Sequence, residues 1–183
     1  MTDHQLLERM LAGEEEAFLT LYRRRQGPVY RFAWHMSGSA SIAEEVTQEV
    51  FLTLVRDGRR YDAARGTVES YLYGIARNHV LRTLERDRPY VALEAETSET
   101  LAAPDDPLAE LTREERLEGL RQAVVSLPAS YREVVVLCDL HEMDYAGAAE
   151  VLGCPVGTLR SRLHRARALL GEKLRGNPAR CLV

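Results

Sequence analysis

The chain has 183 residues, of which 45% are hydrophobic, and a formal net charge of -4. This length suits one ordinary domain or two small ones with true cores. No apolar run approaches the ~20 residues that span a bilayer, and the start lacks the basic-then-apolar order of a signal peptide. The three cysteines are odd in number and widely spaced, which argues against a disulfide framework. We therefore expect a soluble, cytoplasmic protein without membrane insertion.

Residues 3–36 carry apolar side chains at three- and four-residue steps, which predicts helix. Gly13 and the pair Gly27 and Pro28 predict breaks or kinks within it, because glycine and proline interrupt helices.

The next helix is expected over residues 42–57. Ser41 and Glu44 have the spacing of a capping box, in which the serine caps forward and the glutamate reaches back. One side of this helix is apolar, and the other side is acidic and amide-bearing. The second side carries Glu44, Glu45, Gln48 and Glu49.

Residues 58–66 predict a loop by composition, after which Thr67 can cap a helix that Pro89 ends. This helix has one apolar side, surrounded by aromatic, amide and basic side chains. Single-stranded nucleic acid is bound by such a mixture, because bases stack on rings and phosphates need counter-charges. The alternative is that tyrosines at helical spacing belong to the core. The side chains in question are Tyr71, Tyr73, Arg77, Asn78 and Arg82.

Residues 89–110 contain six acidic residues, three prolines and no lysine or arginine, which predicts a flexible acidic linker. Asp106 and Pro107 have the order of an N-cap and a first helical residue, so a helix is expected to run from there to about residue 127. Pro128 separates it from a further helical segment. The fold class is therefore all-α, with two small helical domains over 1–88 and 107–183 joined by a linker over 89–106.

Residues 144–174 contain two short helical patterns that meet at a Gly-Cys-Pro corner. Asp144 can cap the first helix, Gly153 can end it, and Pro155 favours a second start. The second helix has an apolar face opposite a basic, hydrogen-bonding one. A helix-turn-helix domain sets such a helix in the DNA major groove. Its outer face carries Arg160, Ser161, His164 and Arg165.

An ordinary amphipathic hairpin with a solvated face would show much of the same pattern. Charge favours DNA binding, because seven lysines and arginines follow Pro155 against a single acidic residue, although the whole chain is acidic.

A metal site at Cys138, His141 and Cys154 is imaginable, but Cys138 lies in an apolar helical row and is better explained as a small core residue. His79, on an apolar face, is better explained as a hydrogen-bonded core histidine than as a ligand. No glycine-rich phosphate loop, nucleophile–base pair or catalytic carboxylate pair is present. We therefore expect no catalytic residue, no metal, no cofactor and no enzymatic activity.

Three stretches of the chain resemble the extracytoplasmic-function group of bacterial sigma factors, which are promoter-specificity subunits of RNA polymerase. AEEVTQEVFLTLVR resembles the polymerase-docking helix of the group, SYLYGIARNHVLRTLERDR its promoter-melting helix and LGCPVGTLRSRLHRARALL its upstream-element reader. The chain departs from the usual pattern at Tyr71 and Val55, where the group commonly has tryptophan, and at Thr47, where it has an aliphatic residue.

The resemblance implies a role for each set of residues. The first half would be sigma domain two, with Glu45, Gln48 and Glu49 against the clamp helices of core RNA polymerase. The minus-ten element, including a flipped-out base, would be handled by Tyr61, Asp62, Arg65, Tyr71, Tyr73 and Asn78. The second half would be sigma domain four, with Arg160, Ser161, His164 and Arg165 on the minus-thirty-five element of promoter DNA. A dedicated anti-sigma factor would cover the docking surfaces and hold the protein inactive.

Two other classes of protein remain as alternatives. A stand-alone DNA-binding regulator would dimerise and bind duplex DNA by itself. A helical adaptor would bind only protein and would ignore both DNA and salt.

Overall fold

The computed structural model describes residues 1–86 and 113–175, and all regular structure in these ranges is helical. The first half contains α1 (Asp3–Leu11), α2 (Glu15–Ser37), α3 (Ala40–Asp57), the short 3-10 turn η1 (Gly58–Arg60) and α4 (Val68–Arg86). The second half contains α5 (Arg113–Val125), α6 (Ala129–Val135), the π-helical segment η2 (Val136–Leu140), α7 (Tyr145–Leu152) and α8 (Val156–Arg175). Within the described residues, no helix has the length and apolar character needed to cross a membrane.

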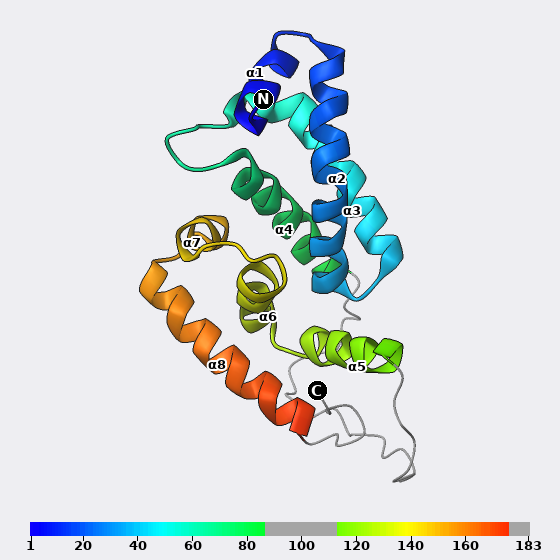
Figure 1. Cartoon of the computed structure of the whole chain (residues 1–183), viewed down its shortest axis with the longest axis vertical. Coiled ribbons are helices and arrows are strands. Elements are labelled where there is room, and N and C mark those ends of the chain that lie inside the picture. Colours follow the sequence, from blue (N-terminus) through cyan, green and yellow to red (C-terminus); the bar gives the residue numbers. More distant parts are fainter. Residues whose placement is uncertain (87–112, 176–183) are drawn as a thin grey trace.

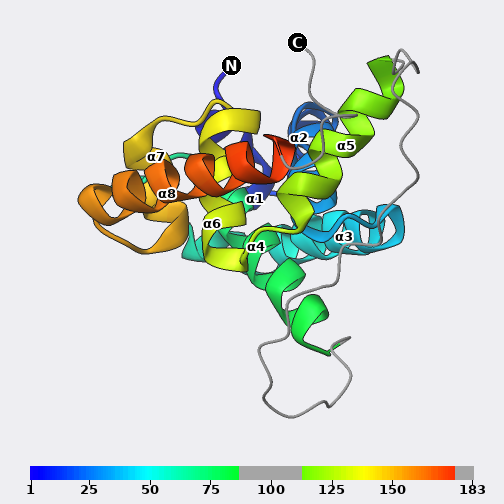
Figure 2. The same ribbon diagram turned by 90° about the horizontal axis from the view of Figure 1, so that it is seen from below.

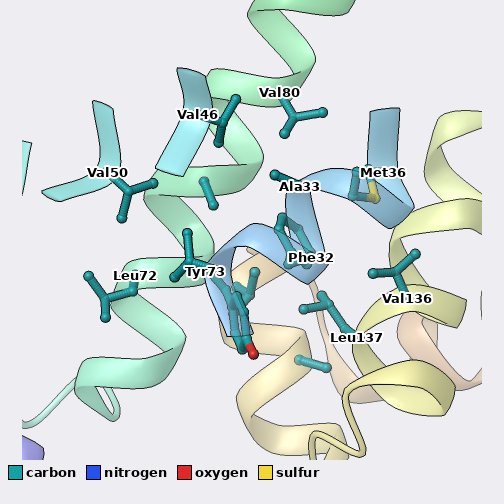
Figure 3. Close-up of a cluster of buried hydrophobic side chains, with 14 of the residues drawn as sticks. Phe32, Ala33, Met36, Val46, Val50, Leu72, Tyr73, Val80, Val136 and Leu137 are labelled. Atoms are coloured by element: carbon teal, nitrogen blue, oxygen red, sulfur yellow. The ribbon is translucent and has the colours of Figure 1, made fainter. Parts of the chain in front are cut away.

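The first half is a bundle in which α2, α3 and α4 pack on one another and α1 lies against α2. Its core is built from the apolar face of each helix, and Figure 3 shows side chains from all three long helices converging. Phe32 of α2, Val46 and Val50 of α3, and Leu72 of α4 are all buried. The apolar side predicted for α3 is buried, and it includes Val46, Val50, Phe51 and Leu54.

The predicted break at Gly13 is confirmed, since this glycine adopts a φ of 97° between α1 and α2. Of the break or kink expected at Gly27 and Pro28, a break is excluded, because α2 runs through both residues. An internal proline removes one backbone donor and costs about 3 kcal/mol in a helix. Here buried residues on either side, Val29 and Leu21 among them, hold α2 against its neighbours, and tertiary packing supplies most helical stability in proteins.

The expected capping box at Ser41 and Glu44 is also wrong. The N-cap of α3 is Ser39, whose Oγ accepts a hydrogen bond from the backbone N–H of Ile42 at 3.4 Å. Gly38 ends α2 in the left-handed region with a φ of 73°, which leaves Ser39 extended, as an N-cap requires. The N-cap therefore lies two residues before the predicted one. By contrast, Thr67 caps α4 as predicted, with its Oγ1 3.1 Å from the amide nitrogen of Ser70.

The second half has the predicted helix-turn-helix. Asp144 caps α7, since its Oδ1 accepts from the N–H of Gly147 at 2.7 Å, and Gly153 ends α7 in the left-handed region with a φ of 60°. α8 starts directly after Pro155, and α5 ends ahead of Pro128. The apolar face of α8, with Leu159 and Leu163, is buried against α6. The predicted linker and the predicted cap at Asp106 and Pro107 lie outside the described residues.

The two halves contact each other directly. α7 packs against α4, while α5, α6 and η2 contact α2. Both views show the second half against α4 and against the end of α2 that leads into α3 (Figures 1 and 2). In Figure 3, Leu137 of η2 lies beside Phe32 of α2 and Tyr73 of α4. The contact between the halves therefore includes an apolar centre.

Candidate nucleic-acid interface

The outer face of α8 is a row of exposed donors. Arg160, Ser161, His164 and Arg165 are all exposed, one to two residues out of step with the buried Leu159, Leu163 and Ala166. The hydroxyl of Ser161 donates to the backbone carbonyl of Thr158 at 2.9 Å, which leaves its oxygen free to accept. A rigid helix with arginines at this face can present bidentate donors to guanine edges in a major groove.

Two contacts from neighbouring elements orient the arginines of α8. The guanidinium carbon of Arg160 lies 5.6 Å from the ring centroid of Tyr145, the first residue of α7. Arg167 makes a bidentate ion pair with Asp139 of η2, at 2.6 Å and 3.1 Å, and this hydrogen bonding raises the pKa of Arg167. Arg167 is thus engaged within the domain, whereas Arg160 and Arg165 face outward. The role of Tyr145 could not be predicted from the periodicity of α7, because its partner Arg160 lies on α8.

The acidic face of α3 is exposed as predicted. Glu45, Gln48 and Glu49 all face solvent, and two large apolar residues, Leu52 and Val55, continue this face with 60% and 57% of their surface exposed. Exposed apolar side chains rimmed by polar ones are typical of a protein-binding surface. The composition of this face therefore favours a protein partner. Nucleic acid is disfavoured, because its phosphates would be repelled by the carboxylates of Glu45 and Glu49.

An open cleft of about 620 Å³ adjoins this face between α2 and α3. Gln48 lies at its edge, and the pair Gly27 and Pro28 forms part of its wall. Thr47, also in the wall, is 8% exposed and donates its hydroxyl to the carbonyl of Ala43 at 2.6 Å. Because its hydroxyl is satisfied by the helix itself, threonine can occupy the position where the sigma group has an aliphatic side chain.

The loop before α4 forms an aromatic cluster with the start of that helix. The ring of Tyr61 lies 5.5 Å from that of Tyr71, and its hydroxyl donates to the carbonyl of Gly66 at 2.9 Å. Asp62 accepts from the N–H of Ala64, which shapes the loop. Asp62 and Arg65 are exposed in the loop, and Asn78 is exposed about two turns along α4 from Tyr71.

Tyr73 is not part of this surface. Only 3% of it is exposed, its ring centroid lies 5.2 Å from that of Phe32, and its hydroxyl lies 2.9 Å from Nδ1 of His141. Burial raises the pKa of Tyr73 to about 12. Since Tyr73 follows Tyr71 by two residues, the two rings leave α4 on different sides. The core interpretation of a tyrosine at helical spacing holds for Tyr73 in this structure.

Cys138, His141 and Cys154, the residues considered for a metal site, do not form a cluster that could hold an ion. His141 lies against Tyr73, and Cys138 is half-buried, with burial raising the pKa of its thiol to about 11. In residues 1–86 and 113–175 no group of three potential metal ligands is placed to hold an ion. His79 is half-buried, with Nε2 3.5 Å from the hydroxyl of Thr53.

The two halves match two parts of one protein family. The family model for Sigma-70 region 2 matches residues 21–89, and the model for Sigma-70 region 4 matches residues 117–170. These matches correspond to the bundle that carries the α3 and α4 surfaces and to the helix-turn-helix half.

Named relatives agree over most of the chain. The chain is 35% identical to the ECF RNA polymerase sigma-E factor of Escherichia coli (strain K12), with 95% of each chain covered. It is 36% identical to the ECF RNA polymerase sigma factor SigE of Mycolicibacterium smegmatis over 84% of this chain, and spans 60% of that longer relative.

A solved structure of CnrH in complex with the cytosolic domain of CnrY is similar over 96% of this chain and 98% of that chain, with a TM-score of 0.73 and 25% identity. Sequence, fold and the two matched regions agree, and the chain belongs to the ECF RNA polymerase sigma factors.

Proposed function

We propose that this chain binds core RNA polymerase and directs promoter-specific initiation of transcription in the cytoplasm. The proposal is supported by two separate exposed surfaces in one chain of the sigma family, the basic face of α8 and the acidic face of α3 with its exposed Leu52 and Val55. A stand-alone regulator needs only the first surface and an adaptor only the second. The role is regulatory, with promoter DNA and polymerase as partners.

The minus-thirty-five element is read by α8. Arg160 and Arg165 supply donors suited to guanine, while Ser161 and His164 add shorter hydrogen-bonding groups between them. Arg167, held by Asp139, keeps α8 seated on η2.

The minus-ten element is handled by the loop and the outer side of α4. Tyr61 and Tyr71 supply rings for stacking, and Asp62, Arg65 and Asn78 supply hydrogen-bonding groups to an unstacked base. Tyr73 could join them only if its contact with His141 opened, because its hydroxyl and ring are otherwise covered.

Core polymerase docks on the α3 face through Glu45, Gln48 and Glu49, with Leu52 and Val55 adding apolar area. An anti-sigma factor holds the protein inactive by covering such surfaces. The likeness to CnrH, which was solved in complex with the cytosolic domain of CnrY, supports binding of a protein partner by this fold.

The test is reconstitution. One recognition helix buries less than the ~1,000 Å² typical of specific protein–DNA complexes, so the purified chain should bind promoter DNA weakly by itself. Addition of core polymerase should give run-off transcripts from a promoter that neither component transcribes alone. Tight, salt-sensitive duplex binding without transcription would favour the stand-alone regulator. Binding to protein partners with no response to DNA or salt would favour the adaptor.

A further inference from the structure

The first helix, α1, contacts both elements that flank the loop proposed to handle the minus-ten element. This minus-ten loop (residues 61–66), which carries Tyr61, Asp62 and Arg65, lies between η1 and α4. α1 packs mainly on α2 and also contacts η1 and α4 (Figure 1). No residue of α1 takes part in the proposed function, so the reason for these further contacts has to be sought in the loop.

The apolar side of α1 holds η1, at the first end of the minus-ten loop. Gly58, the first residue of η1, is buried. A Cβ at this position would lie 3.4 to 3.6 Å from side-chain atoms of Leu11, Leu7 and Met10. The backbone of η1 therefore packs directly on α1, and it cannot move without disturbing these side chains.

A chain of three charged side chains holds the second end of the loop. Asp3 of α1, whose side chain is 10% exposed, accepts from Nε of Arg25 of α2. Nη1 of Arg25 also donates to Glu69 at 2.6 Å, and Glu69 belongs to the first turn of α4. Hydrogen bonds between charged groups are stronger than neutral ones, and the planar guanidinium fixes their direction. The chain of ion pairs thus fixes the start of α4 relative to α1.

A ring contact joins α1 to the minus-ten loop itself. The ring centroid of His4 lies 5.9 Å from that of Tyr61, with an interplanar angle of 54°. Rings at such separations attract each other. Tyr61 also packs on Tyr71 and closes the loop through its hydrogen bond to the carbonyl of Gly66. His4 therefore supports Tyr61 from outside the loop.

Attachment of α1 to the bundle does not by itself require these polar contacts. Leu6 and Leu7 are fully buried, and burial of apolar side chains holds a helix in place without fixing its direction. Asp3 and His4 add directional contacts, and these lead to the start of α4 and to the minus-ten loop. A loop that is already ordered loses less conformational entropy when it takes up an unstacked base.

We propose that α1 is a positioning element for promoter recognition. Through the ion pairs Asp3–Arg25–Glu69 and the ring contact His4–Tyr61, it holds the minus-ten loop in the conformation that accepts an unstacked base. Asp3, His4, Arg25 and Glu69 are then positioning residues, which act through the loop rather than by contact with DNA. The inference rests on the proposed function, because it names what orders the minus-ten surface.

The test uses the assembled polymerase and two single-stranded oligonucleotides, one with the minus-ten element of the reconstituted promoter and one with that element scrambled. Their affinities, measured by fluorescence anisotropy, give a selectivity ratio. Arg25→Gln breaks the link from α1 to α4 and should lower this ratio about three- to tenfold. Arg24→Gln is the matched control, because Arg24 donates to Asp3 and to the carbonyl of Met1 rather than to α4. It should keep nearly the wild-type ratio.

Two further variants separate positioning from contact with DNA. Glu69→Ala breaks the same link at its other end, so the double variant Arg25→Gln/Glu69→Ala should lose no more selectivity than either single variant. His4→Ala should lower the ratio about two- to tenfold. His4→Phe should restore it, because phenylalanine keeps a ring beside Tyr61. Failure of phenylalanine to restore the ratio would overturn the positioning role of His4, since the imidazole itself would then be needed.

Helix content, measured by circular dichroism, and affinity for core polymerase should be unchanged in these variants, because the α3 face is not altered. If Arg25→Gln loses helix, His4→Ala decides, because the side chain of His4 is exposed. A wild type that does not select the minus-ten oligonucleotide would contradict the proposed function. A wild type that selects it, with equal selectivity of Arg25→Gln and Arg24→Gln, would overturn only the role of α1.

Discussion

The two helices assigned to promoter DNA present their side chains differently. On α8 all four predicted reading residues are exposed, whereas on α4 Asn78 is exposed, Tyr71 is half-buried and Tyr73 is buried under the second half. The face of α8 is set by its own amphipathic period. The exposed face of α4 is set by what packs on it, so the side chains proposed to contact DNA are accessible on α8 and only partly accessible on α4.

The largest expected effect tests whether the exposed face of α8 is sufficient for transcription without the docking face of α3. Glu49 is on the exposed face of α3, so Glu49→Lys should leave the helices intact while reversing a charge in the polymerase-docking face. Removing one partner of a buried interfacial charge pair costs about 2 to 5 kcal/mol, so run-off transcription should fall at least about 30-fold. Glu16→Lys, the same change on an exposed residue of α2, is the control. Full activity of Glu49→Lys would remove α3 from the docking surface.

The next effect concerns readout by α8. Arg160→Ala and Arg165→Ala should each weaken promoter binding by the polymerase complex by about 1 to 3 kcal/mol, and should relax sequence preference at one position of the minus-thirty-five element. Arg167→Ala should change sequence preference less, because Arg167 is paired with Asp139. Promoter variants measured by transcription competition give this comparison. Equal, sequence-independent losses for all three would make α8 a phosphate clamp.

These expectations from sequence succeeded where the signal is local. The cap at Asp144, the turn at Gly153 and the exposed row from Arg160 to Arg165 depend on neighbours within one or two turns. Ser39 displaced the predicted Ser41 because Gly38 fixes the conformation of the residue after it. Pro28 failed to break α2, since tertiary packing outweighs one lost donor.

Other features depend on partners far along the chain, and no local pattern contains them. Whether Tyr73 stacks on bases or packs in a core is decided by His141, 68 residues away. Glu133 occurs within an apolar stretch, a weak signal of a buried pair, yet its partner Arg77 is 56 positions distant. The contact between the halves was therefore beyond sequence reasoning, although both halves were predicted.

A smaller effect is expected from pH through His141, which contacts Tyr73 of α4. Burial, and next the nearby His35 and Arg31 of α2, lower the pKa of His141 to about 4, while Tyr73 of α4 contributes a neutral hydroxyl. The contact between the two halves thus requires neutral His141. Its stability is complete above the ordinary pKa of about 6.5 and is lost as the pH falls from there toward 4.

Each pH unit below about 6.5 can raise the fraction of chain with separated halves at most about tenfold through this one group. The radius of gyration of wild type, measured by small-angle X-ray scattering, should therefore rise between pH 7.5 and pH 5.5. His141→Gln, which cannot be protonated, should show most of this change abolished. A wild-type radius that is constant over the same interval, with helix content unchanged, would show that His141 does not couple the contact between the halves to pH.

The smallest expected effect concerns Tyr145 of α7, and it tests whether DNA binding by α8 depends on a residue outside α8. The ring of Tyr145 lies under the guanidinium of Arg160 and is 38% exposed, and a cation–π contact at an exposed site contributes about 0.5 to 1 kcal/mol. Tyr145→Leu should therefore weaken binding of the assembled polymerase to the minus-thirty-five element by about two- to fivefold. The loss should vanish when Arg160 is already alanine, because the ring then has no cation to orient.

Tyr145→Phe is the matched control, since it keeps the ring and loses only the hydroxyl. If phenylalanine restores wild-type binding, the ring positions Arg160, and the reading face of α8 extends to the first residue of α7. If phenylalanine binds as weakly as leucine, the hydroxyl itself contacts DNA and Tyr145 belongs among the residues that touch the promoter. A loss that persists in the Arg160→Ala background would have the same meaning, because it could not pass through Arg160.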